Sequence, residues 1–203
     1  MDKPTPLYRA DMSEPHVVGV VGSLRDQSYT RVGIERALAA AEELGATTEL
    51  LDLREFNLPV FDADHREAGD AVELTDRVHA ADSILLGTPV YHGSYSGVLK
   101  NALDYCGFDE FEHKTVGLLA VAGGGFPITA LEHLRSVCRA LNCWVIPHQA
   151  AVPNARNHIA DGRITDTDIE ERVTTLGEEA VQYANIEPDP ACFESTENVG
   201  ADD

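Results

Sequence analysis

The chain has 203 residues, which is enough for one α/β domain and too short for two ordinary ones. It carries 35 acidic and 15 basic residues, so its formal net charge is −20. This charge argues against nucleic acid as a partner, because phosphate backbones are bound by basic surfaces. A membrane span is not expected either, because no apolar run approaches the roughly 18 residues that one needs.

The two ends of the chain differ in composition from its middle. Residues 1–15 hold no apolar segment of the kind found in a secretory signal. Residues 186–203 are polar, acidic and without periodicity. We predict a loose N-terminal arm and a disordered acidic tail around one domain at residues 16–185. The four cysteines form no C-x-x-C pair, so we expect reduced thiols and a cytoplasmic location.

The basic residues are mostly arginine. Lysine occurs three times, and the other twelve of the 15 basic residues are arginine. An acidic surface with little lysine suits a salt-rich cytoplasm, where the Debye length falls to about 3 Å at 1 M salt and self-repulsion weakens. We therefore predict a halophilic protein. The alternative is an ordinary acidic protein with an acidic tail.

Five apolar runs rich in valine, isoleucine and leucine predict parallel strands that are buried on both faces. They cover residues 16–22, 47–52, 83–88, 115–122 and 143–149. Helical patterns cover residues 30–44, 71–80, 97–105, 127–141 and 167–184. Gly45 is expected to end the first helix as a C′ glycine, and Thr167 or Asp168 to cap the last one. This alternation predicts an α/β fold with a doubly wound, five-stranded parallel sheet.

The loop after the first predicted strand has the chemistry of a phosphate site. Ser23, Ser28 and Thr30 offer hydroxyl groups, and Arg25 offers a permanent cation. The loop leads into a helix N-terminus, where free N–H groups favour an anion. It matches neither the G-x-x-x-x-G-K-[ST] nor the G-x-G-x-x-G pattern. The alternative is a polar loop whose serine only caps the helix.

A second loop of this kind follows the third predicted strand. Residues 88–107 read TPVYHGSYSGVLKNALDYCG, which is a turn rich in glycine and serine followed by an amphipathic helix. Such a loop lies at the carboxyl end of its strand, where open α/β sheets bind ligands.

Together the segments GSLRDQSYTR and TPVYHGSYSGVLKNALDYCG resemble the two signature stretches of the NADPH-dependent FMN reductase family, in the flavodoxin-like superfamily. The family patterns are G-S-x-R-x-x-S and, approximately, P-E-Y-N-x-S-x-P-G-x-L-K-N-A-[IL]-D-[WY]. Their order and spacing match this chain. The resemblance covers residues 16 to about 184 and implies a flavodoxin-like fold of three layers, α/β/α.

The resemblance also implies a flavin site. It implies that Ser23, Arg25, Ser28 and Thr30 hold the FMN phosphate. The residues implied to border the ring and ribityl chain are Pro89, Val90, Tyr91, His92, Gly93 and Ser94. A third loop, with Gly123, Gly124, Gly125 and Phe126, is implied to lie under the polar edge of the ring, where backbone N–H groups would stabilise reduced flavin. The alternative for these glycines is a flexible connection.

Three residues depart from the family pattern. His92 stands where asparagine is common, Val90 where glutamate is frequent, and Ser96 where proline is usual. For His92, a loop histidine without a catalytic role is the simpler interpretation. Lys100 and Asp104 lie one helical turn apart and are expected to form a structural ion pair.

Other chemistries find little support in the sequence. No His/Cys cluster has the spacing of a metal site. Neither Cys106 nor Cys138 is expected to be a nucleophile, and Cys138 is expected in the core. Ser23 and Ser94 do not sit in a G-x-S-x-G pattern.

The resemblance predicts an FMN-dependent NAD(P)H oxidoreductase with no catalytic side chain of its own. A hydride would pass from NADPH or NADH to flavin N5 and then to a small acceptor such as a flavin, a quinone, an azo compound or a metal oxyanion. The alternatives are a flavodoxin-like electron carrier or a non-catalytic flavin-binding protein, and, third, a hydrolytic or regulatory domain without flavin. A homodimer or tetramer is also expected, with Leu131, Leu134 and Val137 in a core or an interface.

Overall fold

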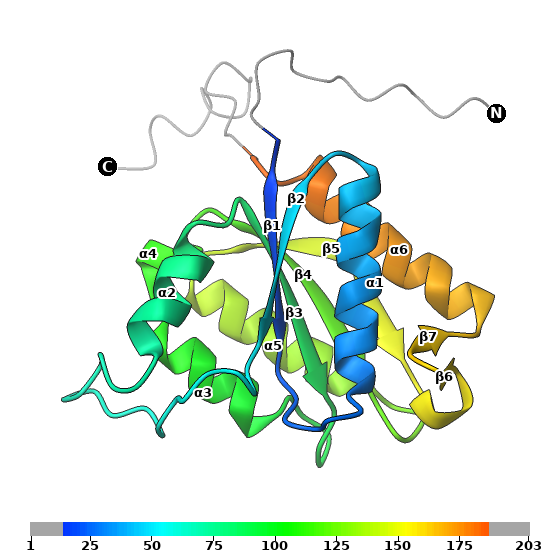
Figure 1. The fold of residues 1–203 in the computed structure, drawn as a ribbon, viewed down its shortest axis with the longest axis horizontal. Helices are drawn as coiled ribbons and strands as arrows, with labels where there is room; N and C mark the ends of the chain where they lie inside the picture. The colour runs from blue at the N-terminus through cyan, green and yellow to red at the C-terminus, as the bar shows by residue number, and fades with distance from the viewer. Residues whose placement is uncertain (1–13, 187–203) are drawn as a thin grey trace, which may run out of the picture.

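The computed structural model describes residues 14–186. The arm and the tail predicted at the two ends lie outside these residues, apart from residues 14, 15 and 186. The described residues form a central sheet with helices on both faces (Figure 1).

The sheet has five strands, all parallel, in the order β2-β1-β3-β4-β5. The strands are β1 (His16–Val21), β2 (Thr47–Asp52), β3 (Ser83–Pro89), β4 (Thr115–Val121) and β5 (Trp144–Val152). The predicted five-stranded, doubly wound sheet is confirmed, and its order is that of flavodoxin-like folds. The order changes direction between β1 and β3, which puts a ligand crevice at the carboxyl ends of these strands.

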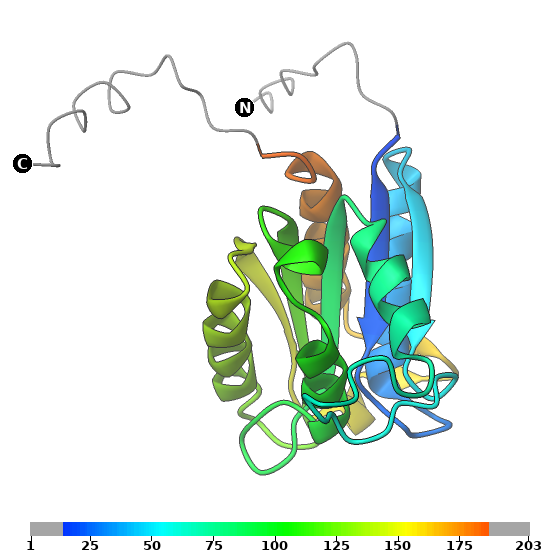
Figure 2. The same ribbon diagram turned by 90° about the vertical axis from the view of Figure 1, so that its left-hand side faces the viewer.

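The helices divide between the two faces. One face carries α1 (Tyr29–Glu43) and α6 (Thr167–Gln182). The other carries α2 (Ala71–His79), α3 (Gly97–Tyr105), α4 (Phe108–Phe111) and α5 (Ile128–Ala140). In Figure 2, α2, α3 and α4 lie in front of the strands, with α1 and α6 behind them.

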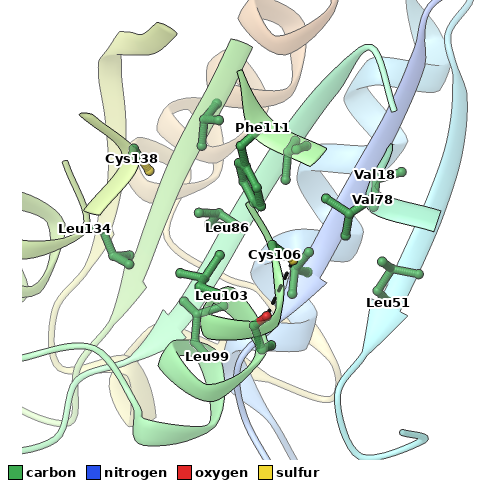
Figure 3. Packing of buried hydrophobic residues seen from close by; sticks show 14 of the residues in the cluster. Val18, Leu51, Val78, Leu86, Leu99, Leu103, Cys106, Phe111, Leu134 and Cys138 are labelled. Carbon is green, nitrogen blue, oxygen red and sulfur yellow. Dashed lines mark hydrogen bonds between the residues drawn. The ribbon is translucent and has the colours of Figure 1, made fainter. Parts of the chain in front are cut away.

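Each face of the sheet has its own hydrophobic core because successive strand side chains point to opposite faces. In β3, Ile84 and Leu86 pack with the α2–α5 group, while Leu85 packs with α1 and α6. Figure 3 shows the first core around Phe111, which is fully buried. Cys138 has no exposed surface there, as expected.

Several element boundaries differ from those predicted. The N-cap of α6 is Asp166, whose carboxylate accepts a hydrogen bond from the Ile169 N–H at 3.0 Å, so the prediction of Thr167 or Asp168 as the cap is wrong. Both of those residues lie inside the first turn of the helix. Gly45 does end α1, with a left-handed φ of +87°.

Strand β5 is longer than predicted and is irregular. Its register against β4 shifts between Val116 and Leu118. Pro147 lies in this stretch and has no N–H to donate, which edge strands tolerate where the ladder is interrupted. The strand then resumes and ends at Val152 rather than at Gln149.

The sequence patterns also missed some short elements. These are α4, a 3₁₀ turn η1 (Ala155–Asn157), and a hairpin of β6 (Ile159–Ala160) and β7 (Arg163–Ile164).

Candidate functional site

Three loops meet at the carboxyl edge of the sheet, the lower edge in Figure 1. We name them the phosphate loop (residues 22–28, after β1), the ring loop (residues 90–96, after β3) and the glycine loop (residues 122–127, after β4). Because β1, β3 and β4 are neighbours in the sheet, their loops are neighbours as well. The structure therefore brings all of the predicted site residues to one edge of the molecule.

Ser96 ties the ring loop to the phosphate loop. Its buried hydroxyl donates to the Gly22 carbonyl at 2.6 Å and accepts from the Leu99 N–H at 3.1 Å, which caps α3. The Ser96 N–H donates to Thr88 Oγ1 at 2.9 Å. In the sequence, Ser96 was notable only as a departure from proline. A proline there has neither the hydroxyl nor the N–H that make these bonds.

The side chains predicted for the phosphate have different surroundings. Ser23 is buried, and its Oγ accepts a long hydrogen bond of 3.4 Å from the Arg25 N–H. Ser28 is the N-cap of α1, where its Oγ accepts from the Arg31 N–H at 3.2 Å. Capping uses only the oxygen of Ser28 as an acceptor, so its hydroxyl proton remains available to donate. Thr30 is also buried in the first turn of α1.

The phosphate loop also offers donors that the folded chain does not use. Within residues 14–186, the backbone N–H groups of Asp26 and Gln27 have no hydrogen-bond acceptor. The Arg25 guanidinium is exposed and has no partner in the same part of the chain. Free N–H groups close to a helix N-terminus, beside an exposed cation, are suited to binding a phosphate.

The ring loop is a tight turn with the side chain of His92 exposed at its tip. Tyr91 and Ser94 exchange backbone hydrogen bonds of 3.0 and 3.1 Å, and the central residues His92 and Gly93 have φ values of +51° and +80°. Left-handed backbone at both central positions favours Asn-Gly, which agrees with the asparagine of the family pattern. His92 therefore occupies a position with a backbone requirement, and its side chain is exposed.

A second histidine lies beside the ring loop. His133 of α5 has its Nδ1 3.0 Å from the Ser94 hydroxyl, and its ring lies edge-on to Tyr95. These contacts link α5 to the ring loop. Residue spacing gave no sign of this pair, because 39 positions separate its members.

The glycine loop is exposed and has free space above its backbone. A Cβ added to Gly123, Gly124 or Gly125 would meet nothing within 4 Å, and none of the three has a left-handed φ. Packing within the described chain therefore gives no reason for glycine here. A ligand that approaches the backbone closely would give one.

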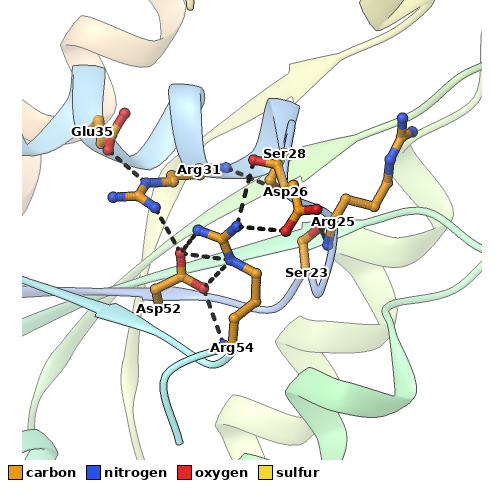
Figure 4. Close-up of polar contacts among 8 residues, drawn as sticks. All are labelled: Ser23, Arg25, Asp26, Ser28, Arg31, Glu35, Asp52 and Arg54. Carbon is orange, nitrogen blue, oxygen red and sulfur yellow. Dashed lines mark hydrogen bonds and ion pairs between the residues drawn. The ribbon is translucent and has the colours of Figure 1, made fainter.

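A cluster of charged residues lies next to the phosphate loop (Figure 4). Asp52, the last residue of β2, is only 1% exposed and lies between two arginines. Arg54 Nε lies 3.0 Å from both of its carboxylate oxygens, and Arg31 Nη1 lies 3.1 Å from one of them. Burial opposes ionisation of Asp52, but the hydrogen bonds and charge of the arginines outweigh it and lower the pKa of this carboxyl. The sequence patterns missed this cluster.

A comparison with protein families matches most of this chain. The NADPH-dependent FMN reductase family matches residues 15–157, which include all three loops. The chain belongs to this family. The resemblance that the two loop sequences predicted is thus confirmed. The name of the family refers to the reduction of FMN by NADPH.

One relative of this chain is the FMN-dependent NADPH-azoreductase of Staphylococcus aureus (strain USA300). It is 38% identical over 119 residues, which cover 57% of this chain. The match spans 63% of the length of the azoreductase.

Solved structures support the fold. An NADH:FMN oxidoreductase superposes with a TM-score of 0.69 at 20% identity, over 86% of this chain and 92% of its own. The NAD(P)H:acceptor oxidoreductase FerB of Paracoccus denitrificans also gives a TM-score of 0.69, at 23% identity, over 84% and 97%.

Two surface hollows lie away from the three loops. One of about 640 Å³ is lined by residues such as Val72, Tyr105 and Phe108, and one of about 380 Å³ lies between α3 and α5. Neither contains a residue of the phosphate, ring or glycine loop. Within residues 14–186, no helix is long and apolar enough to cross a membrane, and no three metal-binding side chains cluster.

Proposed function

We propose that the protein is an FMN-dependent NAD(P)H oxidoreductase that binds FMN at the carboxyl edge of its sheet. The observation that carries this proposal is the phosphate loop, which lies next to the ring loop and whose N–H groups and Arg25 side chain are not engaged by any other residue between 14 and 186. Family membership supports the same conclusion.

Each loop has its own part in this proposal. Ser23, Arg25, Ser28 and Thr30, with the free amides between them, hold the phosphate. Pro89 at the end of β3 and the ring loop as far as Ser94 flank the flavin, and the Ser96 bonds hold the ring loop against the phosphate loop. The glycine loop, Gly123–Gly125, offers open backbone to the polar edge of the ring. When bound, FMN supplies reversible hydride transfer.

The acceptor that we propose is a small molecule bound at the carboxyl edge of the sheet. Azo compounds are the acceptor that the name of the Staphylococcus aureus relative suggests, and flavins, quinones and metal oxyanions remain candidates. NADPH is the proposed donor, with NADH as the alternative. His133, linked to the ring loop through Ser94, lies close enough to that loop to contact an acceptor stacked there.

The absorption spectrum of the purified protein tests this proposal. We expect a flavin spectrum that bleaches when NADPH is added without oxygen and returns when an azo dye is supplied. A flavin spectrum that NADPH leaves unchanged, with a one-electron intermediate on chemical titration, would favour an electron carrier. A colourless protein that takes up no added FMN would contradict the proposal.

We also propose that the subunit self-associates as a homodimer or tetramer. Leu131 and Leu134 are fully buried in the core of the subunit, so they are not available for an interface. Val137 is only partly buried and lines the hollow between α3 and α5. An interface on this side would cover apolar surface that the single subunit leaves in contact with water.

A further inference from the structure

Arg54 connects the end of β2 to the phosphate loop. Its guanidinium forms a fork on Asp52, and its backbone N–H also donates to the Asp52 carboxylate at 3.1 Å. Asp52 is in turn held by Arg31 of α1, which pairs with Glu35 at 2.8 Å. The Arg54 side chain is 20% exposed, and the buried carboxylate of Asp52 holds its guanidinium on one side. An arginine held in this way has little freedom left to lose.

The other side of Arg54 faces Asp26 of the phosphate loop (Figure 4). Arg54 Nη1 lies 3.6 Å from an Asp26 carboxylate oxygen and 3.5 Å from the Asp26 carbonyl oxygen. The Asp26 side chain is fully exposed and follows Arg25 directly in the chain. An unpaired carboxylate at this position would repel the phosphate that Arg25 attracts. Arg54 is the cation that offsets it.

The contact with the Asp26 carbonyl also orients a donor. A trans peptide is planar, so its C=O and the following N–H point in opposite directions, and no described peptide bond is cis. With the Asp26 carbonyl turned toward Arg54, the Gln27 N–H points away from it. This N–H is one of the free donors of the phosphate loop, and Arg25 also extends away from the Asp52–Arg54 pair in Figure 4.

We propose that Arg54 is a positioning residue for the FMN phosphate: held by Asp52, it neutralises Asp26 and keeps the Asp26–Gln27 peptide in the orientation that presents the Gln27 N–H to the ligand. The inference rests on the FMN site proposed above. Arg54 acts through the loop and does not need to touch the phosphate itself. Its effect is therefore specific to a flavin that carries a phosphate.

The test compares the affinities of the protein, freed of flavin, for FMN and for riboflavin by fluorescence quenching. Arg54→Met should weaken FMN binding roughly tenfold or more and riboflavin binding less than about twofold, because one charge-assisted interaction is worth about this factor. Arg36→Met is the matched control. Arg36 carries the same charge but pairs with Glu170 of α6 at 3.2 Å and forms no hydrogen bond or ion pair with the phosphate loop within residues 14–186, so its loss should leave both affinities unchanged.

A second variant separates positioning from folding. Adding Asp26→Asn to Arg54→Met removes the carboxylate that Arg54 offsets, and should restore at least part of the lost FMN affinity without changing riboflavin binding. Arg54→Lys keeps the charge and is expected to fall between the wild type and Arg54→Met. If Arg54→Met does not fold, Arg54→Lys replaces it in the comparison with the wild type. In that case, an Arg54→Lys protein that binds both flavins like the wild type would overturn the proposal.

The outcomes distinguish this inference from the function itself. Equal losses for FMN and riboflavin, no loss for either, or a double variant no better than Arg54→Met would overturn the role of Arg54 and leave the flavin site intact. A wild-type protein that binds neither flavin would overturn the proposed function instead.

Discussion

Arg25 differs from the neighbouring arginines in that its side chain forms no ion pair within residues 14–186. Arg31 and Arg54 are engaged with Asp52, while the Arg25 side chain has no partner within residues 14–186. In a chain with a net charge of −20, one free guanidinium at the ligand edge is a strong local exception.

We therefore predict that Arg25→Ala weakens FMN binding by about 1.5–3 kcal/mol, the scale of charge-assisted hydrogen bonds. Riboflavin, which lacks the phosphate, should bind as it does to the wild type. Isothermal titration with both flavins measures the difference. Arg139→Ala is the control, because Arg139 is also exposed and lies near the end of α5, far along the chain from the loop. Similar losses for the two flavins would remove Arg25 from the phosphate site.

Asp52 gives a prediction about pH. Its pKa is below the ordinary 3.8, so its ionisation stabilises the fold above about pH 4, and this contribution disappears as pH falls through the lowered pKa. Asp52→Asn should cost about 2 kcal/mol at pH 7, less than the roughly 3–5 kcal/mol of fully buried pairs, because solvent screens the partly exposed arginines.

The free energies of unfolding in urea at pH 7, 5 and 3 check this sign. The gap between wild type and Asp52→Asn should be constant from pH 7 to 5 and should narrow toward pH 3, because the Asp52 carboxyl of the unfolded chain, with its ordinary pKa, takes up a proton before that of the folded protein does. A gap that widens toward acid would show that the carboxylate is not the stabilising form.

At the scale of elements, α1 and α6 approach each other so closely at Gly177 that no side chain fits there. A Cβ on Gly177 of α6 would lie 2.0 Å from the Ala37 carbonyl oxygen of α1. This glycine is required by backbone-to-backbone contact, and not by its own conformation.

We predict that Gly177→Ala destabilises the protein by about 1–3 kcal/mol, even though alanine is the better helix former by about 1 kcal/mol. The control is Gly97→Ala at the start of α3, where an added Cβ meets nothing within 4 Å. Thermal melts should show a lower Tm for the first variant and an unchanged or higher Tm for the second. An unchanged Tm for Gly177→Ala would mean that the two helices separate at little cost.

The core elements were predictable because each carries its own periodic pattern, and their predicted ends lie within one or two residues of the observed ones except at β5. The β6–β7 hairpin had a readable signal that was missed. Asp161 and Gly162, with φ values of +49° and +71°, form its turn, and Asp-Gly is a common hairpin pair. Its strands of two residues each are too short to show a period.

For the whole molecule, the acidic surface predicts a response to salt. Stability should rise between roughly 0.1 M and several molar KCl, because the Debye length falls from about 10 Å to under 3 Å and the charges repel one another less. Melting temperatures across this range measure the effect. A flat or falling curve would contradict the prediction of a halophilic protein and leave the flavin site unaffected.

The predicted self-association is also a property of the whole molecule. Light scattering in high salt should give a mass of two or four subunits, and Val137→Glu should lower it by placing a charge in the proposed interface. Ser136 also lines the hollow between α3 and α5, so Ser136→Glu should lower the mass as well if the interface covers this side of the subunit. A monomeric mass for the wild type would refute the proposal.

The sequence by itself determined the fold class, the family and the loops that make up the candidate site, since all of these depend on residues close together in the chain: apolar periods, turn residues and two contiguous motifs. Only the tertiary structure could decide which side chains support those loops. Ser96 and Gly22 are 74 positions apart, Ser94 and His133 are 39 apart, and Arg54 and Asp26 are 28 apart. These pairs meet because the parallel strands bring distant loops to one edge, and no local pattern records such a meeting.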